Sequence, residues 1–157
     1  IGTVGSDAKK ETILANGAAH AVNYKTENFT EAARDVTGGE GVHVVYDSVG
    51  KDHYQGSIDS LRRRGMMINF GNASGPVPPI DAVELNVKGS LFFTKASMRF
   101  YQLSRAELEN SAATLFDAIG SGAVKPFIGQ TYALADAAQA HIDVWDGKTT
   151  GSTVLSV

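Results

Sequence analysis

Small, polar or cationic residues follow several predicted strands of this sequence, at the point where each strand ends. In chain order they are Gly5, Ser6 and Lys9; Tyr24; Asp47, Ser48, Val49 and Gly50; Gly71 and Asn72; and Thr94 and Lys95. The carboxyl ends of strands in an open parallel sheet share one edge, and ligands bind there. We therefore expect these residues to line one ligand-binding edge.

The first of these groups favours an anion. An acidic residue at the end of the second strand of a dinucleotide-binding fold hydrogen-bonds the adenosine ribose, and its charge would repel a 2′-phosphate. Here that position is Gly5 or Ser6, with Lys9 one helical turn further on. A hydroxyl, a helix N-terminus and an ammonium group favour NADPH over NADH. A plain helix cap with an exposed lysine is the alternative, and Asp7 counts against a phosphate unless it points away as a cap.

Other chemistries have little support in the sequence. The chain has no cysteine, which excludes disulfides, thiolate chemistry and cysteine-ligated zinc. The histidines, whose spacing matches no compact metal motif, are His20, His43, His53 and His141. Ser48, His53 and Asp47 could form a hydrolase triad on paper, but Ser48 lacks the G-x-S-x-G context. We expect no metal site and no hydrolase.

Charge and hydropathy limit the partners. The net charge of -3 argues against a general nucleic-acid partner, because phosphate binding needs a basic surface. No apolar run approaches the roughly 20 residues that span a bilayer, so no membrane partner is expected. The absence of cysteine favours a reducing, cytoplasmic setting.

Strands alternate with helices along the whole chain. Expected strands cover residues 1–5, 21–24, 42–47, 66–70, 90–94, 128–132 and 153–157. Helices should follow from near residues 7, 28, 52, 104 and 135; the third should end at Gly65, with Arg62–Arg64 in its last turn. Residues 42–47 form a nearly continuous apolar run, typical of a strand buried on both faces. The alternation predicts an α/β fold with a doubly wound parallel sheet, the Rossmann arrangement.

The expected domain is incomplete. No G-x-G-x-x-G follows a strand, and the chain opens directly on the strand Ile1–Gly5. We interpret this as a fragment that lacks the first strand and the glycine-rich loop. Residues 1–126 would form a partial dinucleotide-binding domain, and residues 127–157 a strand-helix-strand segment returning toward an absent catalytic domain. The strands near residues 1–4 and 42–46 would then have unpaired edges, which predicts a chain that is unstable, oligomeric or fills the gap with another strand.

The sequence resembles the downstream part of the quinone oxidoreductases, the zeta-crystallin-like branch of the medium-chain dehydrogenase/reductase superfamily. The resemblance covers essentially the whole chain, with IGTVGSDAK at 1–9, VNY at 22–24, VVYDSVG at 44–50, RRGMMINFGN at 63–72 and KGSLFFT at 88–94. It implies a zinc-free, usually homodimeric NADPH:quinone reductase, in which hydride passes from nicotinamide C4 to a quinone. The fragment alone would be inactive, and no catalytic residue can be named.

The resemblance also implies where the cofactor lies. The adenosine ribose and its 2′-phosphate would be met by Gly5, Ser6, Lys9 and Tyr24. The adenine and ribose pocket would be lined by Ser48 and Val49. The nicotinamide half would pass beside Phe70, Gly71 and Asn72 and approach Phe93 and Thr94. The strand Ser90–Thr94 would pair with its symmetry mate in the dimer. Lys95 stands where the family often has arginine, so no role is assigned to it.

Two other functions stay open. A zinc-free alkenal or enoyl reductase could use the same cofactor half, because a fold does not fix a substrate. A structural or dimerisation module would bind cofactor without turnover. A methyltransferase is disfavoured, since that class usually needs an acidic residue after the second strand.

Overall fold

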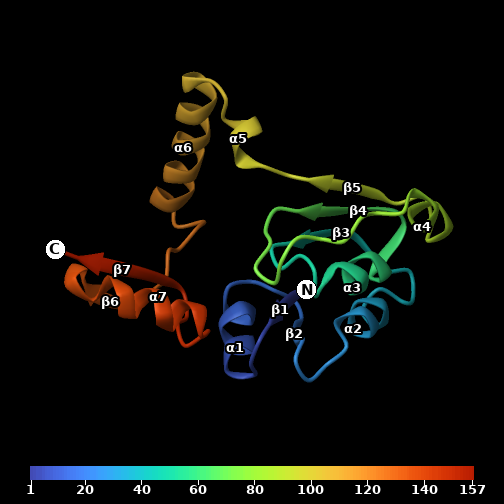
Figure 1. Cartoon of the computed structure of the whole chain (residues 1–157), viewed down its shortest axis with the longest axis horizontal. Coiled ribbons are helices and arrows are strands. Elements are labelled where there is room, and N and C mark those ends of the chain that lie inside the picture. The colour runs from blue at the N-terminus through green and yellow to red at the C-terminus, as the bar shows by residue number, and fades with distance from the viewer. The chain divides into compact units, whose positions relative to one another are not determined.

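The computed structural model describes residues 1–157 as alternating strands and helices (Figure 1). Contacts between residues divide the chain into two compact units, Ile1–Ser97 and Met98–Val157. The predicted dinucleotide-binding part, residues 1–126, contains all of the first unit and part of the second. Its boundary between residues 126 and 127 stays a prediction.

The strands of the first unit form two parallel sheets. β1 (Gly2–Val4) pairs with β2 (Ala21–Asn23). β3 (Val42–Asp47), β4 (Leu61–Asn69) and β5 (Phe92–Lys95) form the other sheet, in that order, with β4 in the middle (Figure 1). The predicted parallel α/β architecture is therefore confirmed.

No strand lies between β1 and β3. β1 pairs only with β2, and β3 pairs only with β4, so each sheet has an open edge. These orders are those of a doubly wound sheet without its first strand, as predicted. The expectation that β3 is buried on both faces is wrong, since Val44 is 40% and Tyr46 72% exposed. Without a neighbouring strand on this side, β3 lacks the side chains that would cover it.

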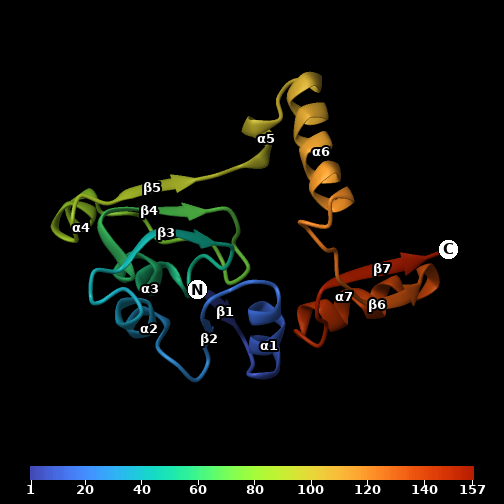
Figure 2. The ribbon, with the colours of Figure 1, turned by 180° about the vertical axis from the view of Figure 1, so that it is seen from behind.

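Two helices of the first unit begin where the sequence predicts. α1 (Ala8–Ala15) connects β1 to β2 and lies beside them in both views (Figure 2). α2 (Phe29–Asp35) is capped by Asn28, whose side-chain oxygen accepts the N–H groups of Thr30 and Glu31. Such a cap satisfies N–H groups that have no partner within the helix.

The third helix is shorter than predicted. α3 (Tyr54–Asp59) ends before Leu61, which pairs with Val42 and starts β4. Arg62–Arg64 therefore lie in β4 and not at a helix end. Arg64 has a φ of 61° and donates its N–H to the carbonyl of Gly89 at 2.8 Å. A long-range pairing thus replaces the last helical turns that local pattern favoured.

The fifth strand also begins later than predicted. The short helix α4 (Ala82–Val87), which was not predicted, precedes it. Gly89 and Ser90 have φ values of 119° and 54° and form the turn after that helix. Since Ser90 belongs to this turn, pairing with β4 starts at Phe92 and not at Ser90.

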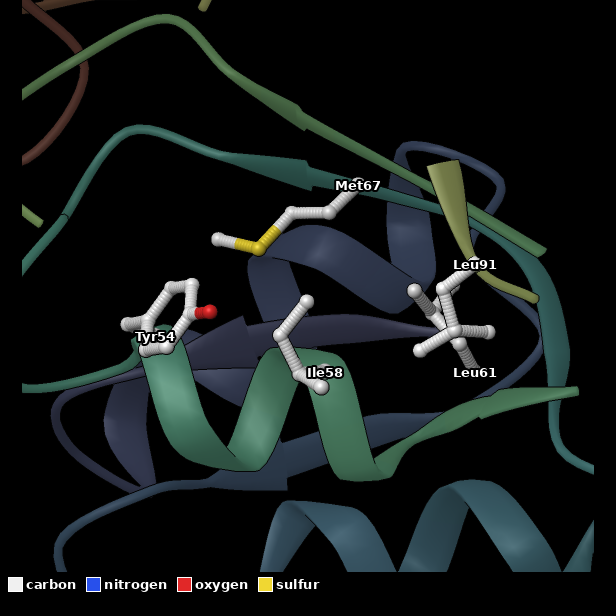
Figure 3. Close-up of a cluster of buried hydrophobic side chains, with 5 residues drawn as sticks. All are labelled: Tyr54, Ile58, Leu61, Met67 and Leu91. Carbon is white, nitrogen blue, oxygen red and sulfur yellow. The ribbon is translucent and has the colours of Figure 1, made fainter. Parts of the chain in front are cut away.

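The core of the first unit lies between α3 and the larger sheet. Tyr54 and Ile58 of α3 point toward Met67 of β4, beside Leu61 and Leu91 (Figure 3). Met67 is 0% and Ile58 1% exposed. This packing fixes β4 and holds the carboxyl ends of its neighbours in place.

The second unit contains two parallel strands. Its elements are α5 (Met98–Tyr101), α6 (Arg105–Gly120), β6 (Ile128–Ala133), the 3-10 helix η1 (Leu134–Asp136), α7 (Ala137–Trp145) and β7 (Ser152–Ser156). β6 and β7 pair, with α7 between them in the chain. Helix α6 begins near residue 104 as predicted, with a capping box: Ser104 accepts the N–H of Glu107, whose carboxylate accepts the N–H of Ser104. Helix α6 buries none of its residues.

Candidate functional site

The last residues of β3, β4 and β5 form a row across the sheet. Asp47 lies opposite Asn69, and Asn69 lies opposite Lys95, in parallel register. Asp47 is 3% and Asn69 0% exposed, so two polar side chains are buried at the carboxyl edge. Buried polar groups need hydrogen-bond partners, and the loops that begin here supply them.

The carboxylate of Asp47 organises the first of these loops. Its Oδ1 accepts the N–H of Val49 at 2.7 Å and that of Gly50 at 3.2 Å. Asn69 donates to its Oδ2 at 3.3 Å from the neighbouring strand. The side chain that ends β3 thus serves as an acceptor for the turn, and its buried charge is met by three donors.

A second loop, after β4, packs closely on the first. Ala73 donates its N–H to the carbonyl of Ser48 at 3.2 Å, and Ser74 donates to that of Val49 at 2.8 Å. A Cβ on Gly71 would lie 2.3 Å from the Ser48 carbonyl oxygen, so only glycine fits there. Three of the predicted site residues, Ser48, Val49 and Gly71, are therefore brought together.

A cavity of about 410 Å³ runs along β3. Its lining includes Ser48, Val49 and His53 after β3, and Gly2 and Thr3 of β1. It therefore lies between the open edges of β1 and β3, and it reaches the carboxyl edge where the predicted adenine and ribose pocket begins.

The predicted phosphate side gathers around Gly5. A Cβ on this residue would lie 2.7 Å from the Tyr24 hydroxyl and 3.5 Å from Cε of Lys25. The Tyr24 ring contacts the His53 ring edge-on at 4.6 Å between centroids. Tyr24 thus links the end of β2 to the segment after β3. From the sequence, His53 was a candidate only for a metal site or a hydrolase triad, and no local pattern predicted its contact with Tyr24.

Asp7 does not cap helix α1, contrary to one expectation for it. No side-chain cap bond is present; its Oδ1 instead accepts from Asn23 Nδ2 at 3.0 Å. Lys10 Nζ lies 3.6 Å from the same oxygen. The charge that counted against a phosphate is therefore paired with a cation and directed toward β2.

Lys10 also forms an ion pair with Glu27, close in sequence to Tyr24 of the predicted phosphate site. Its ammonium donates to Glu27 Oε1, and this bond raises the pKa of Lys10 and lowers the pKa of Glu27. A carboxyl group whose pKa is lowered by folding stabilises the folded chain above its unfolded pKa. That contribution is lost as the pH falls through the lowered pKa.

We expect Glu27→Gln to melt below the parent chain at neutral pH, with the difference closing below about pH 4. Melting temperatures measured from pH 3 to pH 8 check this. The matched control is Glu40→Gln, because the Glu40 carboxylate is exposed and makes no ion pair. A difference that stayed constant over the whole range would contradict the assignment.

The predicted nicotinamide side is divided between exposed and packed residues. Phe70 is 55% exposed, and Asn72 Oδ1 accepts from Lys95 Nζ at 2.8 Å. The Phe93 ring packs on Tyr54 in the core, with centroids 6.3 Å apart. A contact of Phe93 with a cofactor would therefore come from its backbone. Thr94, half-buried, follows it in β5.

No group of three or more His, Cys, Asp or Glu side chains could hold a metal ion. None of the helices has the length and apolar character needed to cross a bilayer.

The chain matches a known protein family over most of its length. Residues 16–155 correspond to the family described as zinc-binding dehydrogenase. The chain belongs to this family. Curated relatives include a 2-haloacrylate reductase from Burkholderia sp, 45% identical over 99% of this chain and 47% of the relative. A quinone oxidoreductase from Salmonella typhimurium is 46% identical over 99% of this chain and 48% of its own length.

A solved structure of Escherichia coli quinone oxidoreductase complexed with NADPH has a TM-score of 0.94 and 42% identity, covering 99% of this chain and 48% of that protein. The resemblance to the quinone oxidoreductases of the medium-chain superfamily is therefore confirmed, as is the Rossmann-like fold. The chain spans about half the length of the relatives that it matches.

Proposed function

We propose that this zinc-binding dehydrogenase family chain is the cofactor-binding part of an NADPH-dependent oxidoreductase that reduces a quinone. The observation that carries the proposal is the convergence of Gly5, Tyr24, Ser48 and Gly71 at the carboxyl ends of parallel strands. Relatives named quinone oxidoreductase, one of them solved with NADPH, support the same cofactor and substrate class.

The residues around Gly5 fit a 2′-phosphate. Ser6 and Lys9 stand at the start of α1, and the Tyr24 hydroxyl lies over Gly5. The carboxylate of Asp7 is engaged by Asn23 and Lys10. Hydroxyl and ammonium donors at a helix N-terminus favour a bound anion. The set therefore selects a phosphorylated adenosine.

The rest of the edge would orient the cofactor. NADPH, when bound, supplies hydride from nicotinamide C4. The loop of Ser48 and Val49 would border the adenine and ribose, and Phe70, Gly71 and Asn72 would hold the nicotinamide half, with Phe93 and Thr94 near its amide. These residues position the cofactor and exclude water. We assign no acid, base or catalytic residue to this chain.

We also propose that the protein forms a homodimer through strand β5. β5 is the outer strand of its sheet, and Phe92 on it is 52% exposed. Pairing through the predicted strand Ser90–Thr94, observed from Phe92, would give a homodimer with a continuous sheet.

Residues 1–126 would bind the cofactor, and residues 127–157 would return to the catalytic part. The enzyme would be zinc-free and cytoplasmic.

A second substrate class is favoured by one finding. The relative named 2-haloacrylate reductase is 45% identical to this chain. An activated alkene is therefore the alternative to a quinone, in line with the alkenal or enoyl reductase kept open above. A substrate panel on the whole protein separates the two. NADPH binding without turnover of either class would favour a structural or dimerisation role.

Titrating the chain with NADPH and NADH tests the proposal. We expect NADPH to bind about tenfold or more tightly, because charge-assisted hydrogen bonds to the 2′-phosphate are absent with NADH. Tyr24→Phe should weaken NADPH binding several-fold and leave NADH binding unchanged. Tyr101→Phe, in the second unit, is the matched control. Equal affinities for the two cofactors would refute the phosphate site.

A further inference from the structure

The row Asp47–Asn69–Lys95 is a continuous hydrogen-bonded chain as well as a register feature. Lys95 Nζ donates to Asn69 Oδ1, so the amide oxygen of Asn69 faces Lys95 and the amide nitrogen faces Asp47. Asn69 Nδ2 then donates to Asp47 Oδ2 at 3.3 Å and to the Gly71 carbonyl at 3.0 Å. The Asp47 carboxylate in turn accepts the N–H groups at the start of the next loop.

The amide of Asn69 connects a cation to a buried anion. An ionised carboxylate that is 3% exposed is costly unless it is paired and hydrogen-bonded. Lys95 does not reach Asp47 directly, but its charge polarises the amide between them. Hydrogen bonds in series strengthen one another in a low-dielectric interior. The ammonium thus stabilises the Asp47 carboxylate through Asn69.

Lys95 also holds the second loop directly. Its Nζ lies 3.2 Å from the Gly71 carbonyl oxygen and 2.8 Å from Asn72 Oδ1. One ammonium therefore contacts the loop after β4 and, through Asn69, supports the loop after β3. Ser74 also joins the two loops, since its hydroxyl donates to the Val49 carbonyl at 2.9 Å, but Lys95 is the cation in this network and is itself exposed.

We propose that Lys95 is a positioning residue for the cofactor, acting through the buried Asn69–Asp47 pair to fix both loops before NADPH binds. This inference rests on the proposed function, because it assumes that the two loops held by Lys95 border the bound NADPH. A preformed loop binds more tightly, since less ordering remains for the moment of binding.

Lys95→Met tests the proposal with two readouts. Amide hydrogen exchange at Val49 and Gly50 should become about tenfold faster, because the acceptor of these N–H groups loses support. NADPH binding should weaken about tenfold. Exchange in the paired strands β6 and β7 should not change. Lys95→Arg, which keeps the charge and several donors, should restore both readouts to within about threefold.

Two further variants make the result specific. Lys95→Gln keeps a donor without the charge and should fall between Met and the parent, which keeps the test usable if Lys95→Met unfolds. Lys88→Met removes the ion pair that Lys88, which follows α4, makes with Asp59 of α3, and should leave exchange at Val49 and Gly50 unchanged. Equal amide exchange at Val49 and Gly50 in Lys95→Met and in the parent would contradict the positioning role of Lys95, whatever the NADPH affinity. A parent chain that binds neither NADPH nor NADH contradicts the proposed function, and with it a role of Lys95 in cofactor binding.

Discussion

Gly50→Ala should lower the free energy of unfolding of the first unit by about 2–5 kcal/mol and abolish NADPH binding. Gly50 has a φ of 89°, where an L-residue is strained by about 1–2 kcal/mol. A Cβ here would also lie 2.3 Å from the Gly75 carbonyl oxygen, a backbone atom. The loop after β4 must therefore move away from the loop after β3, at a further cost of about 1–3 kcal/mol.

Gly39→Ala is a matched control for this variant. Gly39 has a φ of 90°, and nothing lies within 4 Å of the Cβ position. Gly39→Ala should therefore lose only the conformational part, about 1–2 kcal/mol, and keep NADPH binding. Urea unfolding followed by circular dichroism, with a cofactor titration of each variant, gives both quantities. Equal losses for the two glycines would mean that contact between the loops does not determine the site.

Val44→Lys should weaken self-association of the chain about tenfold or more. β1 and β3 each have an open edge, and β3 presents Val44 and Tyr46 to solvent. Unpaired edges with exposed apolar side chains pair readily with another chain. Burying one valine contributes about 1.5–3 kcal/mol, and a lysine there also opposes pairing by its charge. Sedimentation velocity over a range of concentrations measures the effect.

Val83→Lys distinguishes pairing at the strand edge from nonspecific hydrophobic association. Val83 is 65% exposed, more than Val44, but lies on helix α4. It should leave the association constant unchanged. A parent chain that is monomeric and melts sharply at high temperature would contradict the role given to the open edges, as would an equal effect of both lysines.

Local signals in the sequence were sufficient for much of the fold. Asn28 predicted the start of α2 and Ser104 that of α6, because each cap involves residues within a few positions. The alternation of strands and helices predicted the parallel pairing. The positions of Ser48 and Gly71 after apolar strands predicted that their loops would meet, since parallel strands end at a common edge.

Other features depended on residues far apart in the chain. The helix expected through Arg64 ends at Asp59 because Leu61 pairs with Val42, a contact that no local pattern reports. The burial expected for β3 fails for the same kind of reason: an apolar run is covered only where a neighbouring strand is present.

The sequence by itself determined the alternating elements, the caps and the residues that end each strand, because these follow from short-range hydrogen bonding and hydrophobic periodicity. Only the tertiary structure decided that Lys95 supports Asp47 through Asn69 and that His53 contacts Tyr24. Those contacts depend on strand register, and register is set by the packing of whole elements around Met67 and Ile58.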